Sequence, residues 1–87
     1  MAEEIEGQPI GEITHYFSKI GVGVIKLSGV LKTGETIRIV GGEETDFEQP
    51  VESMEVEHQK VDTAKAGESV GLKVAQKVRE GYKVYKI

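Results

Sequence analysis

The spacing of apolar residues is the feature that most restricts how this chain can fold. Apolar side chains recur mostly at every second position, as at Ile37 and Ile39 or at Val70, Leu72 and Val74. This period places them on one face of a β-strand. No window of about 11 residues or more carries the apolar stripe of a helix without an interrupting Gly or Pro. The sequence therefore predicts a β-protein without a substantial helix.

Six strands are expected, separated by segments rich in turn-forming residues. Their approximate ranges are 11–17, 22–28, 36–40, 50–57, 69–75 and 83–87. Pro50 is expected at the start of its strand, where a missing N–H is tolerated. Closing such a sheet would pair its two edge strands and remove the aggregation hazard that open edges carry. We therefore predict an all-β fold, a closed six-stranded Greek-key-type barrel.

One short pattern occurs three times, each time before an expected strand. KTGETIRI at 32–39 recurs as KAGESVGL at 65–72 and, more loosely, as REGYKVYK at 79–86. A phosphate-binding loop needs a Lys after its last Gly and a helix behind it. No copy has that Lys, and each continues into β-branched residues. The pattern therefore predicts a turn, with its Gly at positive φ, that enters a strand.

These motifs, in their order, resemble the β-barrel second domain of translational GTPases such as elongation factor Tu. The matching residues are Leu31, Gly34, Glu35, Ile37 and Ile39, then Ala64, Gly67, Glu68, Val70 and Gly71, and finally Arg79, Gly81 and Val84. The resemblance covers residues 10–87 and implies a translation elongation factor domain 2 fold, after a flexible segment at residues 1–9. The chain has no Asn and no Gly-Lys pair, so the family's GTP-binding motifs are absent. The resemblance thus implies the barrel without nucleotide binding.

A second resemblance is to the C-terminal barrel of U32 peptidases and of peptidase-like RNA-modifying proteins. It is clearest around Asp46-Phe47 and around Val51-Glu52-Ser53-Met54. This resemblance implies a barrel that docks on an enzyme of that class.

Composition narrows the classes of function. The 87 residues provide for one domain and one core. The lack of cysteine excludes disulfides, thiolate metal sites and a cysteine nucleophile, and makes the cytoplasm the expected compartment. No apolar run approaches the roughly 20 residues of a membrane helix, so no membrane partner is expected. The lack of Asn together with abundant Glu and Lys is a bias reported for heat-adapted proteins.

Basic residues gather near the C-terminus although the net charge of −4 disfavours undirected nucleic-acid binding. Lys73 and Lys83 are expected to point outwards from their strands, where nearby tyrosines could stack on bases. The candidate nucleic-acid-binding residues are Lys73, Lys77, Arg79, Tyr82, Lys83, Tyr85 and Lys86. The alternative is a set of solubilising lysines with tyrosines packed at the barrel rim.

The segment from Glu43 to Glu57 is acidic and contains no Lys or Arg. It lacks the residue spacing of a calcium loop, so the simpler interpretation is the solvent face of a strand. Phe47 is either an anchor in the barrel mouth or an exposed contact. Asp46, Phe47 and Glu48 are the candidate protein-interaction residues.

No motif predicts catalysis. His15 and His58 are the only histidines, no H-E-x-x-H spacing occurs, and no serine has the context of a catalytic triad. We therefore expect no enzyme activity, no metal site and no cofactor. The predicted function is a non-catalytic binding module that contacts RNA or a ribonucleoprotein. The alternative is a protein-interaction adaptor that docks on a U32 peptidase-like or RNA-modifying enzyme. Both rest on fold analogy.

Overall fold

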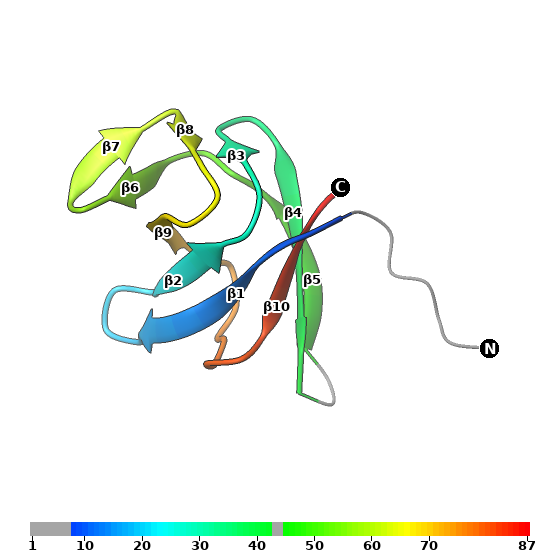
Figure 1. The fold of residues 1–87 in the computed structure, drawn as a ribbon. Helices are drawn as coiled ribbons and strands as arrows, with labels where there is room; N and C mark the ends of the chain where they lie inside the picture. The colour runs from blue at the N-terminus through cyan, green and yellow to red at the C-terminus, as the bar shows by residue number, and fades with distance from the viewer. Residues whose placement is uncertain (1–7, 43–44) are drawn as a thin grey trace.

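The computed structural model describes residues 8–42 and 45–87 and shows an all-β domain within them (Figure 1). These residues form ten strands and no helix. The strands are β1 (Gln8–Phe17), β2 (Val22–Leu27), β3 (Leu31–Lys32), β4 (Thr36–Gly41), β5 (Thr45–Pro50), β6 (Met54–Val56), β7 (Gln59–Val61), β8 (Thr63–Ala64), β9 (Ser69–Lys73) and β10 (Lys83–Lys86). Within the described ranges, accordingly, no helix is long and apolar enough to cross a bilayer.

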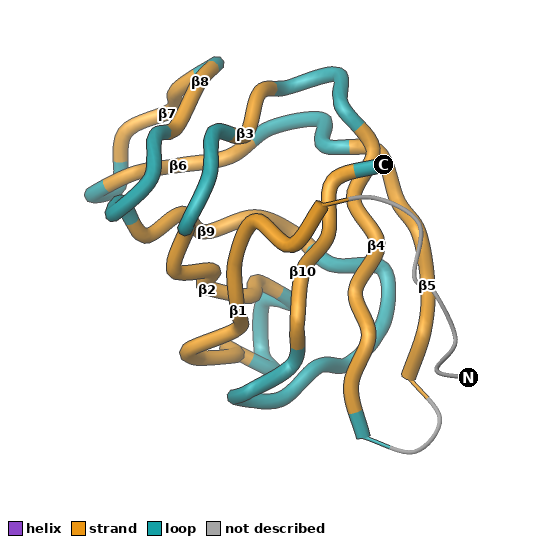
Figure 2. The backbone as a smooth tube through the Cα atoms, turned by 45° about the vertical axis from the view of Figure 1, so that its right-hand side comes forward, coloured by secondary structure: helices purple, strands orange, loops and turns teal. Residues whose placement is uncertain are grey.

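Eight strands form one antiparallel sheet in the order β5-β4-β10-β1-β2-β9-β6-β7, and β3 pairs separately with β8. The sheet curls around a common interior, as the tube in Figure 2 shows. Among the described residues, however, the end strands β5 and β7 each have one backbone partner. The barrel architecture is therefore present, but backbone hydrogen bonds do not close it as expected.

The strand count and several boundaries also differ from the sequence-based expectation. The strand expected over 50–57 corresponds to the end of β5 at Pro50, a stretch at 51–53 outside any strand, and β6. Pro50 pairs with Thr36 on the one side of β5 that has a partner. The sequence shows no alternation of apolar residues over β5, because Phe47 is its only buried side chain. The strands β3, β7 and β8 are too short to show an alternating pattern.

A side chain bridges the gap that the backbone leaves between β5 and the end of β9. The Nε2 of Gln49 donates to the carbonyl of Lys73 at 2.7 Å, and the Oε1 accepts from the N–H of Ala75 at 2.7 Å. The side-chain amide of Gln49 thus supplies one donor and one acceptor to the backbone of the segment opposite. A neighbouring β-strand would supply the same two groups from its own backbone. Gln49 therefore completes locally what strand pairing does elsewhere in the sheet.

The interior is filled by the apolar residues that the period of two placed on one face. The most fully buried side chains are Ile13, Ile25, Leu31, Ile37, Ile39, Val51, Met54, Val70, Val78 and Val84. No polar or charged residue among those described is buried. The predicted inward positions of β4, β9 and β10 are confirmed, and hydrophobic burial is the main source of stability.

The three repeated motifs are turns, as predicted. Their glycines lie at nearly the same positive φ, 91° at Gly34, 92° at Gly67 and 93° at Gly81. In each turn the residue after Gly donates its N–H to the carbonyl three residues earlier, at 3.3 Å, 3.1 Å and 3.3 Å respectively. Positive φ at the third position of a four-residue turn is what a type II turn requires.

Each turn is also hydrogen-bonded to the backbone of a segment distant in sequence, in the same way each time. The glycine N–H donates to the carbonyl of one buried residue, and that residue's N–H donates back to the carbonyl of the residue after Gly. The buried residues are Val51 for the first turn, Leu27 for the second and Ile13 for the third, with distances of 2.7–2.8 Å. In each case the glycine and the residue after it lie opposite a single residue. This arrangement, with Gly at positive φ, is the pattern of a G1 bulge. Each copy of the repeat therefore connects two distant parts of the chain by a pair of backbone hydrogen bonds.

The flexible segment expected at residues 1–9 falls mostly on residues 1–7, which lie outside the described residues. Gln8 and Pro9 belong to β1, where they pair with Lys86 and Tyr85. Glu43 and Glu44, part of the acidic segment, also lie outside the described residues.

Candidate functional site

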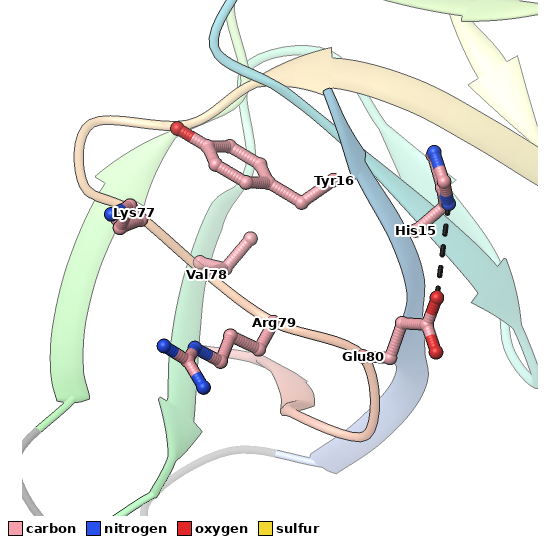
Figure 3. A pocket seen from close by; sticks show the side chains of 6 residues that line it. All are labelled: His15, Tyr16, Lys77, Val78, Arg79 and Glu80. Carbon is pink, nitrogen blue, oxygen red and sulfur yellow. Dashed lines mark ion pairs between the residues drawn. The ribbon is translucent and has the colours of Figure 1, made fainter. Parts of the chain in front are cut away.

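A hollow of about 460 Å³ lies between β1 and the loop that joins β9 to β10. It is lined by His15, Tyr16, Lys77, Val78, Arg79 and Glu80 (Figure 3). Val78 holds the loop in place because its side chain is buried in the core, with 1% exposed. Its two neighbours, Lys77 and Arg79, are exposed on either side of it. Burial of Val78 therefore leaves the side chains of Lys77 and Arg79 at the surface.

The charges in this hollow are unevenly paired. His15 Nδ1 lies 3.8 Å from a carboxylate oxygen of Glu80. No carboxylate in the described part of the chain lies within ion-pair distance of Lys77 or Arg79. Figure 3 shows the Arg79 guanidinium pointing away from the His15–Glu80 pair. The side of the hollow that carries Lys77, Arg79 and Tyr16 is thus positively charged and has an aromatic ring beside it.

The structure distributes the remaining basic candidates elsewhere. Lys83 Nζ lies 3.1 Å from Glu12, and Lys86 Nζ lies 3.5 Å from Glu35. Lys73 is exposed at the end of β9 and lines a different hollow. The C-terminal basic set is therefore not one continuous positive surface. Only Lys77 and Arg79 are brought together in the hollow of Figure 3.

The tyrosines are likewise separated. Tyr82 packs on the β4–β5 hairpin, since a Cβ placed on Gly41 would lie 2.2 Å from its Cγ. Tyr85 is half-buried on β10. The aromatic residue that lines the hollow is Tyr16, which sequence reasoning missed. The register of β1 against β2 shifts between Ile13 and His15, and such a bulge re-aims the side chains that follow it. A strict period of two cannot reveal that change.

The acidic candidates on β5 have different environments. Phe47 is only 8% exposed and belongs to the core, so of the two alternatives the anchor is the one that the structure shows. Asp46 is held by Arg38, whose Nε and Nη2 donate to its two carboxylate oxygens at 2.7 Å and 2.6 Å. These hydrogen bonds keep the pKa of Asp46 below its ordinary value, against the opposing effect of desolvation and with a further contribution from the positive charge of Arg38. Glu48 is exposed.

No metal-binding cluster is assembled in the described ranges. No three His, Cys, Asp or Glu side chains there lie close enough to hold a metal ion. His58 lies in the turn between β6 and β7, whereas His15 lies on β1. The hollow of Figure 3 offers cations, an imidazole and a phenol, which suit the binding of an anionic group.

The barrel and its three turns define a domain of the translation-factor type, and comparison with known proteins agrees. The chain belongs to the Elongation factor Tu domain 2 family, which matches residues 22–84. Among individual proteins, an uncharacterized protease of Methanocaldococcus jannaschii is 40% identical over 89 residues, covering 94% of this chain and 22% of that protein. A collagenase of Porphyromonas gingivalis is 35% identical over 78 residues, covering 88% of this chain and 22% of that protein.

Solved structures show the same architecture. The C-terminal domain of a Geobacillus thermoleovorans protein assigned to the U32 peptidases superposes with a TM-score of 0.86 at 20% identity, covering 91% of this chain and 99% of that domain. A second structure of that domain gives a TM-score of 0.85 at 18% identity, covering 100% and 99%. At this identity the likeness shows the fold. Both resemblances seen in the sequence are confirmed, and the chain spans 22% of the curated relatives just named.

Proposed function

We propose that this chain is a non-catalytic docking barrel of a U32 peptidase-like protein. The observation that carries the proposal is the pair of relatives: a protease and a collagenase each contain this domain as 22% of their length. The catalytic work of such a protein then belongs to the rest of it, and the barrel contributes contacts. Proteins with the same fold can differ in function, so the identity of the partner needs a direct test.

The geometry is consistent with this role. The described residues form a filled interior without a buried polar side chain, and so without the desolvated titratable group that many active sites use. The residues available for recognition are therefore on the surface. The expected boundary at residue 10 and the expected cytoplasmic compartment remain predictions within this proposal.

The test is to isolate the native protein from its own cells with an antibody against the barrel. One half of the sample is treated with RNase, and bound or covalently continuous chains are identified by mass spectrometry. We expect a U32 peptidase-like sequence, present in both halves, either as a partner or as the remainder of a longer chain. Purified components should then re-form the complex. Recovery of no such sequence would overturn the proposal.

RNA binding is a second candidate, favoured by one observation. Lys77 and Arg79 have no ion-pair partner among the described residues and lie beside Tyr16. Cations next to an aromatic ring are the elements of single-stranded nucleic-acid sites. If RNA binds here, Lys77→Glu with Arg79→Glu should abolish salt-dependent binding of tRNA or rRNA fragments. Lys26→Glu with Lys65→Glu changes the net charge equally on exposed residues elsewhere and is the control.

A further inference from the structure

Strand β2 carries two apolar residues on its outer face before the exposed Lys26. Gly23, Ile25 and Leu27 are buried and face the core. Val22 and Val24 alternate with them and so lie on the outer face of the sheet, where they are half-buried. An antiparallel sheet with one solvated face normally carries polar residues on that face. The part of this outer face that carries Val22 and Val24 therefore departs from that pattern.

Residues on the neighbouring strands extend the apolar surface formed by Val22 and Val24 and leave a hollow in it. Across the sheet, Val22 lies opposite Phe17 on β1, and Val24 lies opposite Gly71 on β9. Gly71 in turn lies opposite Glu55 on β6. Val24, Gly71 and Glu55 therefore form a row across the sheet. Because Gly71 has no side chain, the space between Val24 and Glu55 is open. The result is a hollow of about 520 Å³ with Val22, Val24, Gly71 and Leu72 among its lining residues.

The two ends of this outer groove differ in chemistry. At one end Phe17 and Ile20 are 46% and 59% exposed, which makes them two of the four exposed large hydrophobic residues in the described chain. Lys73, which pairs with Val22 on β2, lies at this same end. On the side of β6 and β7, Glu55, Glu57 and His58 form the rim. An apolar floor with an acidic rim is complementary to an apolar side chain that is followed or preceded by a basic one.

The acidic rim is also held in an unfavourable backbone conformation. Glu57 and His58 are the only described residues other than Gly with positive φ, at 52° and 65°. They form the two-residue turn of the β6–β7 hairpin, between the paired residues Val56 and Gln59. Turns of this kind favour Asn-Gly, and other residues cost stability there. Strained positions of this sort cluster at sites of ligand contact, which supports a role for the rim.

Resting on the proposed function, we propose that the outer groove is where the barrel binds the remainder of the U32 peptidase-like protein. The occupant is an extended segment of that protein. It places a large apolar side chain over Gly71 and a Lys or Arg against Glu55 and Glu57. The relatives support this occupant, since most of the length of each one lies outside the matched domain.

The first experiment removes the apolar end of the groove. Phe17→Ser with Ile20→Ser should weaken binding to the purified U32 peptidase-like partner by about tenfold or more, because burying large apolar side chains carries much of an interface's affinity. Val30→Ser with Ile87→Ser is the matched control, since these are the other two exposed large hydrophobic residues. The control pair should change the dissociation constant by less than about twofold, measured by calorimetry.

The second experiment alters the groove without endangering the fold. A Cβ at Gly71 meets only Val22 Cγ1, at an ordinary 3.5 Å, so Gly71→Ala should fold normally and fill the floor. Replacing the strained turn by Glu57→Asn with His58→Gly should raise thermal stability and remove one of the two rim carboxylates. Both variants should weaken binding by about tenfold while remaining folded by circular dichroism.

The outcomes separate the two proposals. If the wild-type chain binds no U32 peptidase-like protein, the proposed function itself fails. If the wild type binds and the groove variants match their control, the partner is right but the outer groove is the wrong surface. If sedimentation shows that the wild type forms a dimer that Phe17→Ser with Ile20→Ser dissociates, the occupant is a second copy, and this inference is overturned.

Discussion

The side-chain oxygen of Gln49 accepts a hydrogen bond from the backbone N–H of Ala75 at 2.7 Å, while its amide nitrogen donates to the carbonyl of Lys73 at the same distance. These two bonds join β5 to the segment after β9, where no backbone pairing exists among the described residues. A single side chain thus connects the two sides of a sheet that would otherwise remain open at this place.

Replacing Gln49 should therefore reduce stability. Gln49→Ala should lower the free energy of unfolding by roughly 1–2 kcal/mol, because two hydrogen bonds are lost. Gln49→Glu should be at least as damaging, since a carboxylate oxygen would then face the Lys73 carbonyl. Urea denaturation followed by circular dichroism measures the change. Gln59→Ala is the control, because Gln59 is exposed and no side-chain hydrogen bond is found for it in the described structure. Equal stability of the two Ala variants would contradict the bridging role.

The left-handed glycines of the three turns should resist substitution. Gly34→Ala, Gly67→Ala and Gly81→Ala should each lower the free energy of unfolding by roughly 1–2 kcal/mol, because φ near +92° at Gly67 and its counterparts is unfavourable for L-residues. Space is not the cause, since a Cβ at each of these positions meets no atom within 4 Å. Gly71→Ala, at ordinary φ in the middle of β9, is the control and should cost nothing. Melting temperatures that fall equally for all four variants would show that the backbone conformation is not the reason.

Gly41 and Tyr82 should be energetically coupled. A Cβ at Gly41 would lie 2.2 Å from Tyr82 Cγ, so Gly41→Ala forces the ring to move and should cost roughly 1–3 kcal/mol of folding stability. In the Tyr82→Ala background the ring is absent, and the same substitution should then cost much less. A double-mutant cycle measured by urea denaturation gives the coupling free energy directly. Additive effects would show that Tyr82 does not pack over the hairpin.

The interaction of Asp46 with Arg38 predicts a pH dependence. Because the pKa of Asp46 is lower in the folded state, the pair contributes stability above the unfolded-state pKa, and this contribution disappears as the pH falls through the folded-state pKa. An NMR titration of the Asp46 carboxyl should give a value below the ordinary one, and Arg38→Gln should return it towards that value. A wild-type Asp46 that titrates normally would contradict this prediction.

The candidate site was partly visible in the sequence. Lys77 and Arg79 were recognised as basic residues near the C-terminus, and they do meet in the hollow of Figure 3. Lys83 belongs to the same basic group in the sequence, yet its ion-pair partner is Glu12, 71 residues away. A distance of that kind follows from how β10 pairs with β1, and no local pattern reports it. The same holds for Tyr16, which a register shift directs towards the hollow.

The sequence by itself determined the all-β class, the inward face of the main strands, the three glycine turns and the family. These properties depend on the spacing of side chains along a strand and on the backbone freedom of Gly. Both can be recognised from residues that are close together in the sequence. Tertiary structure alone decided how many strands form, how Gln49 bridges the open side and which cations are paired. It also decided that Val24 and Gly71 lie side by side to form the outer groove. Residues far apart in the chain come together only when strands pair, and that pairing depends on the whole sheet at once.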